Sequence, residues 1–378
     1  MKISEISGRI TAVLVMAVIF AMFILTICGK KEDFSLSENR ELTSFPKFSV
    51  SSVADGSYGR QLESYMTDHF FVREKWVSAQ ARIESAMCEK IVNGVYVNDK
   101  ILLDAEISSR RISQENISAV NSFFRNYSGT VYFTAVPTSS GIYGDLLPEY
   151  LITNPEKKQI DVLYDSIEDG VRKIDTYNIL RMINDNYIYY RNDSKLTSYG
   201  AYYAYRTIIQ KLGFQPSSYD KYTIRHVTSD FRGNLYSRCL YYGTKSDILD
   251  VYSYSGGAEI TSCTAYGNNG MTYRKILNDE KFLSGGDMYR MYLGDEVPFI
   301  RIKTSVNNDK KLLLIKDSYA DCFIQFLIQH YSEIAVISPA DMTKPLSSFI
   351  NPDNYEQTLF LFGIDSMDNE NLFDLINR

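Results

Sequence analysis

Ser318 is the residue whose type and position in this sequence point most directly to chemistry. It lies in the segment Lys-Asp-Ser-Tyr-Ala at 316–320, which follows the apolar run 312–315 and precedes an amphipathic stretch. This context predicts a strand-to-helix turn, where a serine side chain is exposed and the first N–H groups of a helix are free to hold an anion. Ser318 is therefore a candidate nucleophile, and Asp317 is expected to cap the following helix.

A serine nucleophile needs a neighbouring base that accepts its proton. We expect that base in the segment Asp-Ser-Lys-Leu-Thr at 193–197, which has Lys195 where the chemistry calls for histidine. Lysine normally stays protonated at pH 7, and Asp193 two residues away favours its charged form. Ser–Lys catalysis exists, so two alternatives stay open. The chain is either a scaffold with little or no activity, or an enzyme that uses Lys195 or a rearranged base.

The elements that must position these residues alternate between strands and helices. Buried strands are predicted at 131–136, 312–315, 334–337 and 358–362, and helices after a cap at Ser113 and over 156–174, 197–212 and 319–330. This alternation indicates an α/β fold with a mainly parallel sheet and helices on both faces. The tyrosine-rich, glycine-dotted segment at about 221–276 predicts an antiparallel insertion that forms a wall of the ligand site.

The N-terminal part of the chain predicts one transmembrane helix. Residues 10–28 form an uncharged run of nineteen residues without proline or glycine, long enough to span a bilayer. No small-residue cleavage pattern follows the run, which favours an uncleaved anchor over a signal peptide, with lipidation at Cys28 as a weaker alternative. We therefore divide the chain into an anchor at 1–31, a linker at 32–57 and one domain at 58–378, which is expected outside the cell.

Composition excludes several classes of function. The net charge of −6 argues against a nucleic-acid partner, which requires clustered basic residues. The cysteines and histidines are scattered without metal-ligand spacing, so we expect neither a metal nor another cofactor. A disulfide between Cys239 and Cys263 stays open beside free thiols. The residues in question are Cys88, Cys239, Cys263, Cys322, His69, His226 and His330.

Several separated motifs share their order and spacing with one known family. They are Ser-Glu-Asn-Arg at 37–40, Asp-His-Phe-Phe-Val-Arg at 68–73, Pro137, Leu-Pro at 147–148, Tyr-Arg-Asn-Asp at 190–193, Gly-Ala-Tyr-Tyr-Ala-Tyr at 200–205 and Lys-Asp-Ser-Tyr-Ala at 316–320. Over most of residues 30–340 the chain thereby resembles the DHHW protein family, which is similar to the alginate O-acetyltransferases AlgJ and AlgX. The resemblance implies an SGNH (GDSL-like) hydrolase fold, a three-layer α/β sandwich.

The resemblance also implies roles for particular residues. It makes Ser318 the nucleophile, and it aligns the Asp-His-His-Trp-Thr segment that names the family with residues 193–197. Asp193 and Thr197 are retained there, while Lys195 stands in the place of the catalytic histidine. Where the family has Gly-Asn as a candidate oxyanion hole, this chain has Gly294 and Asp295, and a carboxylate would repel a developing oxyanion.

These observations favour an exported, membrane-anchored pseudoenzyme. We expect a degenerate acyl-esterase or O-acetyltransferase scaffold that binds cell-surface or secreted polysaccharide, with an acyl-donor membrane protein as a further partner. The alternative is an active polysaccharide O-acetyltransferase or acetylesterase that uses Ser318 with Lys195 or a rearranged base. A purely structural wall protein is a third, weaker possibility, for which Ser318 is replaceable without effect.

Overall fold

The central element of the fold is a sheet of eight strands. The computed structural model describes residues 2–86, 90–107, 109–294 and 296–377. The strand order is β11-β10-β12-β14-β13-β15-β6-β7. The strands β14, β13, β15, β6 and β7 pair in parallel, and the pairs β14–β12, β12–β10 and β10–β11 are antiparallel. The strands are β6 (Thr130–Val136), β7 (Arg172–Lys173), β10 (Ile260–Tyr266), β11 (Thr272–Arg274), β12 (Phe299–Thr304), β13 (Lys311–Lys316), β14 (Glu333–Ile337) and β15 (Gln357–Gly363). The predicted mainly parallel α/β sheet is confirmed.

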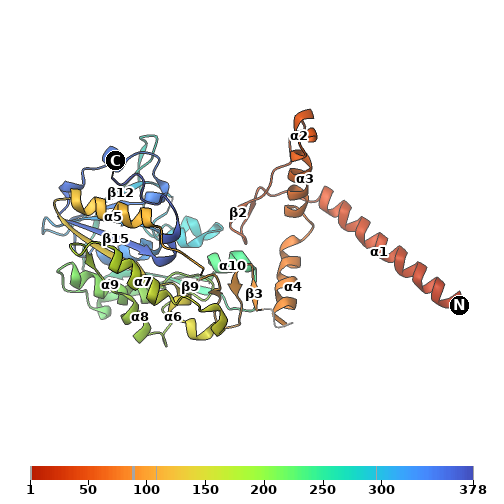
Figure 1. Ribbon diagram of the computed structural model, residues 1–378, viewed down its shortest axis with the longest axis horizontal. Helices are drawn as coiled ribbons and strands as arrows, with labels where there is room; N and C mark the ends of the chain where they lie inside the picture. The colour runs from red at the N-terminus through yellow and green to blue at the C-terminus, as the bar shows by residue number, and fades with distance from the viewer. Residues whose placement is uncertain (1, 87–89, 108, 295, 378) are drawn as a thin grey trace.

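Both faces of the sheet are covered, because side chains alternate between the faces along each strand. On β13, Leu312 and Leu314 belong to one core and Leu313 and Ile315 to the other. The first core contains residues of α8 (Tyr177–Met182), α9 (Ser198–Lys211) and α11 (Ile324–Leu327), and the second those of α5 (Gln114–Asn126) and α7 (Glu156–Ser166) (Figure 1). The side chain of Ser113 caps α5 as predicted.

Two predicted helices are shorter in the structure. α7 ends at Ser166, and part of the stretch expected to continue it forms the edge strand β7. Gly170 lies so close to α5 that a Cβ atom there would be 2.1 Å from the Phe124 ring. The stretch predicted as one helix over 319–330 is a 3-10 helix, η6 (Ser318–Phe323), followed by the short α11. The first turn of η6 is tight because the carbonyl oxygen of Asp317 accepts a hydrogen bond from the N–H of Ala320.

The predicted antiparallel insertion divides into two parts. β8 (Tyr222–Phe231) and β9 (Asp247–Tyr254) form a separate antiparallel pair, with α10 (Asn234–Cys239) between them in sequence. β10 and β11 instead extend the central sheet. Cys239 and Cys263 are both buried free thiols, so no disulfide joins these parts, while Cys88 lies outside the described residues.

The N-terminal elements project from this body. α1 (Lys2–Cys28) extends away from it and contains the one candidate membrane span of the described residues, Gly8–Cys28, with a mean hydropathy of 2.9 (Figure 1). Length and composition allow this helix to cross a membrane. After α1 the chain forms β1 (Phe34–Ser35), β2 (Arg40–Glu41), α2 (Val50–Ala54), α3 (Ser57–Asp68) and α4 (Arg73–Ala86). The small strands β3 (Ile91–Val92), β4 (Val95–Tyr96) and β5 (Leu103–Asp104) follow, and the short helix α6 (Ser139–Ile142) belongs to the body.

Candidate functional site

Ser318 lies two residues after the end of β13, at the first residue of η6, and its side chain is exposed. It lines a cavity of about 350 Å³ whose walls include Lys195. The structure therefore brings two of the three predicted catalytic residues, Ser318 and Lys195, to the surface of one cavity. The buried strand and the turn that follows it place Ser318 there, as the sequence predicted.

Asp193 and Lys195 occupy a tight loop before α9. Asp193 Oδ1 accepts hydrogen bonds from the backbone N–H and from Nζ of Lys195, at 3.0 and 3.2 Å. Its second oxygen accepts from the N–H of Asn234 at 2.9 Å, at the start of α10. Gly233 permits this approach, since a Cβ atom there would lie 2.1 Å from Asp193 Oδ2. Asp193 thus fixes the lysine in place and caps α10.

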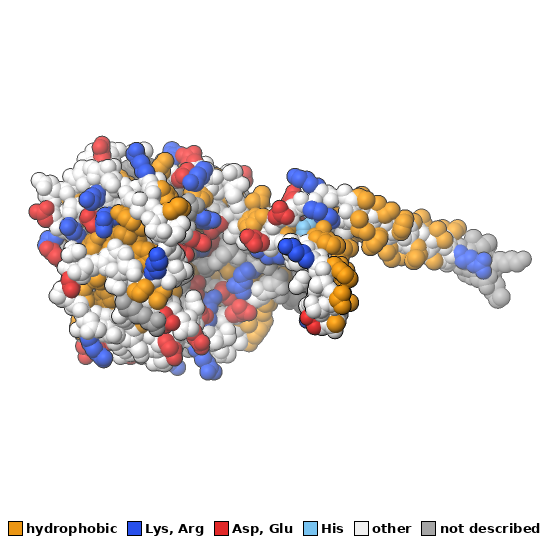
Figure 2. Space-filling view, turned by 90° about the horizontal axis from the view of Figure 1, so that it is seen from above, with side chains coloured by type: hydrophobic (Ala, Val, Ile, Leu, Met, Phe, Trp, Pro, Cys, Tyr) orange, Lys and Arg blue, Asp and Glu red, His pale blue; other side chains and the backbone are white. Residues whose placement is uncertain are grey.

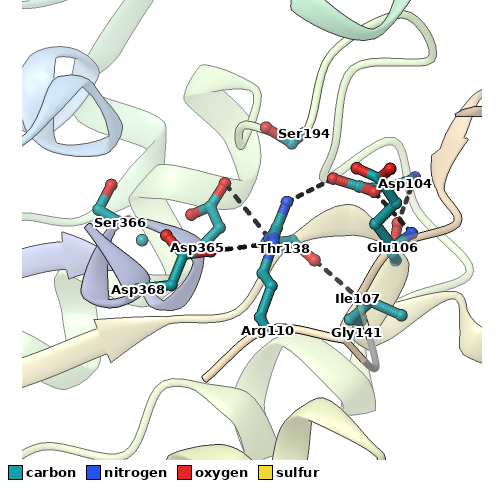
Figure 3. A network of polar contacts seen from close by, with 12 residues as sticks. Asp104, Glu106, Ile107, Arg110, Thr138, Gly141, Ser194, Asp365, Ser366 and Asp368 are labelled. Atoms are coloured by element: carbon teal, nitrogen blue, oxygen red, sulfur yellow. Dashed lines mark hydrogen bonds and ion pairs between the residues drawn. The ribbon is translucent and has the colours of Figure 1, made fainter. Parts of the chain in front are cut away.

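Tyr319 connects the serine turn to this loop. Its hydroxyl lies 3.3 Å from the carbonyl oxygen of Ser194 and 3.1 Å from Asp365 Oδ2, and the ring is buried. Asp365 belongs to a network around Arg110, whose guanidinium also pairs with Asp104 and Asp368 (Figure 3). The serine turn and the lysine loop are consequently held by a charged network that joins three separate parts of the chain.

The charge state of Lys195 decides what the site can do. Burial lowers the pKa of the Lys195 ammonium, but the carboxylates of Asp193 and Asp287 outweigh burial and raise this pKa above its ordinary value. The ammonium also lies 5.1 Å from the centre of the Tyr289 ring, which favours a cation. Lys195 is therefore protonated at neutral pH, and it has no lone pair with which to accept a proton.

No substitute base contacts Ser318 in the part of the chain that the structure describes. The Ser318 hydroxyl makes no hydrogen bond with these residues. Burial raises the pKa of the neighbouring Asp317 to about 7, within the range of a general base. Its two oxygens, however, already accept hydrogen bonds from Tyr319 N–H, Gly363 N–H and the Ser366 hydroxyl. Asp317 is the predicted helix cap, and it also joins β13 to the end of β15.

Part of the region expected to form an oxyanion hole is hydrogen-bonded within the protein. Two of the first N–H groups of η6 are not free, because Asp317 accepts from the N–H groups of Tyr319 and Ala320. Gly294 lines the cavity in a left-handed conformation with φ +83°, and its N–H donates to the carbonyl of Arg290 at 2.5 Å. Asp295 lies outside the described residues. The N–H groups of Tyr319, Ala320 and Gly294 are thus engaged within the protein rather than directed at a reacting oxygen.

Several charged residues of the cavity escaped sequence reasoning. Five carboxyl groups and three cationic groups line it, and in one ion pair Lys316 Nζ lies 2.6 Å from Asp321 Oδ1. The carboxyl groups are Asp287, Glu296, Asp317, Asp321 and Asp341, and the cations are Lys195, Arg290 and Lys316. Most belong to short 3-10 or irregular segments, which carry no periodic signal. Within the described residues no group of three or more His, Cys, Asp or Glu side chains is arranged to hold a metal ion.

A second cavity adjoins the first. It has a volume of about 490 Å³ and shares Lys195 and Asp287 with the serine cavity. Arg40 of β2 and Arg73 of α4 line it from the N-terminal side, and Arg232 lines it from the loop after β8. The candidate site is therefore bounded partly by the segment that leads from α1.

The histidines lie apart from this site. His330 is buried, its Nε2 hydrogen-bonds the Tyr205 hydroxyl, and burial lowers its pKa to about 4. It is therefore neutral, and its role is structural. His226 of β8 is exposed and pairs with Asp250 of β9, and it lines neither cavity. His69 hydrogen-bonds the carbonyl oxygens of Tyr65 and Glu32, a structural role.

Comparison with known proteins identifies related chains. The model of the DHHW protein family matches residues 83–337. A DHHW family protein from Eubacterium siraeum is 22% identical, with a TM-score of 0.58 over 74% of this chain and 94% of that one. Bacillus cereus PatB1, solved with a sulfonyl adduct, is 18% identical, with a TM-score of 0.62 over 74% of this chain and 97% of that one. The O-acetyltransferase domain of Pseudomonas putida AlgJ is 13% identical, with a TM-score of 0.43 over 74% and 93%. No curated protein matches the chain.

Proposed function

Because the chain belongs to the DHHW protein family, we propose that it is an exported, membrane-anchored, SGNH-type scaffold that binds polysaccharide and has little or no acyl-transfer activity. The family match and the two solved folds support the scaffold. The proposed loss of activity depends on one observation, the contact of Lys195 Nζ with Asp193 Oδ1 at 3.2 Å, which favours the charged form of the lysine.

Acyl transfer by Ser318 requires a proton acceptor. When Ser318 Oγ attacks an acetyl carbonyl, a C–O bond forms and the hydroxyl proton must pass to a base. Lys195 Nζ already carries its full set of protons, and loss of one would leave Asp193 and Asp287 without their neighbouring cation. Removal of a triad base commonly costs several orders of magnitude in rate.

The charge of the serine cavity favours a particular kind of ligand. Its carboxyl groups outnumber its cations, which disfavours a polyanion. Carboxylates accept hydrogen bonds from sugar hydroxyl groups, and Tyr289 supplies an aromatic surface beside them. We therefore assign a neutral, hydroxyl-rich polysaccharide at the cell surface as the ligand.

Membrane anchoring by α1 is the second part of the proposal. The uncharged run at 10–28 has the length of a bilayer span, and Lys30 and Lys31 follow it after Gly29. We place the long folded remainder on the outer side, because long domains are translocated largely regardless of the charges that flank a span. Cell fractionation and surface proteolysis test this arrangement. A soluble secreted form beginning between residues 26 and 35 would reject the anchor.

The second candidate function is an active esterase or O-acetyltransferase. It is favoured by the exposure of Ser318 in a cavity and by the retained contact between Asp193 and residue 195. A sulfonyl adduct, such as the one in the PatB1 structure, is what a sulfonyl halide leaves on an activated nucleophile. The same reagent can therefore distinguish the two functions in this protein.

The test compares four forms of the full-length chain in detergent: wild type, Lys195→His, Lys195→His with Ser318→Ala, and the surface control Lys211→His. Wild type should hydrolyse para-nitrophenyl acetate barely above buffer, and Lys195→His should raise the rate at least about tenfold, the low end for one positioned base. Mass spectrometry should detect sulfonylated Ser318 only in the Lys195→His variant. High wild-type turnover that Ser318→Ala abolishes would establish the active enzyme instead.

A further inference from the structure

The N-terminal helices expose an unusual number of large apolar side chains. In the turn between α3 and α4, Phe70, Phe71 and Val72 are 39%, 38% and 40% exposed. On α4, Trp76 and Ile83 are 51% and 58% exposed, and their spacing of seven places them on one face of the helix. Three of these residues, Phe70, Trp76 and Ile83, line a mainly apolar groove of about 830 Å³ formed by residues of both helices.

This turn contacts the end of α1. The N–H of Phe71 donates a hydrogen bond to Thr26 Oγ1 at 3.1 Å, and Phe70 and Phe71 line a cavity together with Leu25 and Thr26. Thr26 lies inside the candidate span Gly8–Cys28. At 1.5 Å per residue it is only about 3 Å from the end of that span. Phe71 therefore lies at the depth where the hydrocarbon core of a membrane would end.

The backbone of the turn is strained. Val72 has φ +50°, and it is the only β-branched residue among the non-glycine residues with positive φ that the structure describes. This conformation costs free energy for a β-branched side chain, and such strain often marks a functional site. In this chain it lies at the break between α3 and α4, where three consecutive apolar side chains are exposed.

The surroundings have the character of a membrane interface. Lys30 and Lys31 follow the span, and Lys75 is exposed next to Trp76. Tryptophan and basic residues are enriched at the level of lipid headgroups. Figure 1 shows α3 and α4 lying across the C-terminal end of α1, and in Figure 2 the hydrophobic side chains of α1 continue onto the adjoining helical segment.

From these contacts we infer that the α3–α4 corner, residues 70–83, lies in the headgroup layer of the membrane that α1 enters. The occupant of the apolar groove is then lipid. This inference rests on the proposed anchoring by α1, and it is independent of the chemistry at Ser318. The N-terminal helices would hold the domain at a fixed orientation through a second contact with the bilayer, in the manner of interfacial amphipathic helices.

Trp76 makes the inference directly testable, because it is the only tryptophan of the chain. The full-length protein is reconstituted into vesicles of phosphatidylcholine and phosphatidylglycerol, with and without brominated acyl chains. Brominated lipid should reduce Trp76 fluorescence by at least half, while aqueous iodide should quench it little. In the variant with Phe70→Ser and Phe71→Ser, the quenching of Trp76 by brominated lipid should fall at least twofold. The hydrogen bond from the N–H of residue 71 to Thr26 Oγ1 can still form in this variant.

The control moves the probe to the body of the protein. A variant with Trp76→Phe and Tyr150→Trp places the tryptophan at a position that is 71% exposed. Iodide should quench this probe and brominated lipid should not, which also confirms that reconstitution leaves the body in water.

Two outcomes would overturn the inference. If Trp76 is quenched by iodide and not by brominated lipid, the corner lies in water. If neither reagent quenches Trp76, protein covers the groove, either a second copy of the chain or another partner. Fractionation of the same vesicles shows whether α1 is inserted, so a failure of the anchoring proposal is distinguishable from a failure of this one.

Discussion

The hydroxyl of Tyr319 lies 3.3 Å from the carbonyl oxygen of Ser194. This contact joins the residue after the candidate nucleophile to the residue between Asp193 and Lys195, across 125 positions of sequence. The Ser194 carbonyl also accepts from the N–H of Ser139 at 3.2 Å. The relative placement of Ser318 and Lys195 is thus set by backbone and neighbouring side chains, which survive substitution at either residue.

Replacement of Tyr319 with phenylalanine should destabilise the protein. The change removes the hydroxyl near Ser194 and Asp365 and keeps the buried ring. We expect a loss of about 1–3 kcal/mol in the free energy of unfolding, the usual cost of an unsatisfied buried partner. Urea denaturation measures it. Tyr150→Phe, at a position 71% exposed, is the matched control and should change nothing. An unchanged midpoint for Tyr319→Phe would show that the hydroxyl contacts contribute little.

Arg110 should be more important still for stability. Its side chain is 20% exposed and pairs with Asp104, Asp365 and Asp368 (Figure 3). In Arg110→Met the three carboxylates lose their shared cation, and we expect a loss of about 3 kcal/mol. The control is Arg125→Met, whose side chain is 67% exposed and pairs with Glu168, and it should cost less than about 1 kcal/mol. Equal effects of the two substitutions would argue against the network.

Glu156 should make stability depend on pH. Burial raises its pKa to about 8, although Thr138 donates two hydrogen bonds to it. Between about pH 4.3, where an unfolded glutamate titrates, and about pH 8, the folded chain holds a proton that the unfolded chain releases. Stability from this group is therefore present at low pH and is lost as pH rises through that window.

Glu156→Gln should flatten that pH dependence. The thermal midpoint of the variant, measured at pH 5 and pH 8, should fall less between the two values than that of wild type. Asp317, with a pKa of about 7, contributes in the same direction and remains in both proteins. Glu149→Gln, on an exposed side chain, provides the control. A variant that is as pH-dependent as wild type would contradict a protonated Glu156.

Ligand preference tests the charge of the serine cavity. Wild type should bind an immobilised neutral polysaccharide more tightly than a polyuronate of equal length at low salt, because like charges repel. Glu296→Gln combined with Asp341→Asn removes two carboxylates from the cavity and should reduce the difference in affinity between the neutral polysaccharide and the polyuronate. Asp161→Asn removes a charge on the surface of α7, away from the cavity, and should leave this difference in affinity unchanged. Tighter binding of the polyuronate by wild type would reject the assigned ligand class.

Local signals in the sequence predict the frame of the site. The apolar run of β13 and the polar turn after it locate Ser318, and the cap residues Ser113 and Thr197 locate the starts of α5 and α9. Each of these features depends on a few adjacent residues. The resemblance in sequence between separated motifs supplies the pairing of Ser318 with Lys195, which no local signal contains.

Other features depend on contacts that sequence does not encode locally. The stretch after Ser318 is buried on nearly every side, including Tyr319, Phe323 and Phe326, so its periodicity does not distinguish a 3-10 from an α-helix. The ends of α7 depend on close packing at Gly170. Asp287 reaches Lys195 from a segment without regular periodicity, and Arg110 finds acidic partners more than 250 residues away.

The antiparallel pairing of β1 and β2 limits how far the site can stand from a membrane. Arg40, which lines the cavity beside Lys195, pairs with Ser35, and Ser35 follows Cys28 by only seven residues. Even fully extended, seven residues reach about 25 Å. With α1 in a bilayer, one wall of the site therefore remains within a few nanometres of the lipid surface. Under the proposed function, the protein would therefore bind polysaccharide close to the lipid surface.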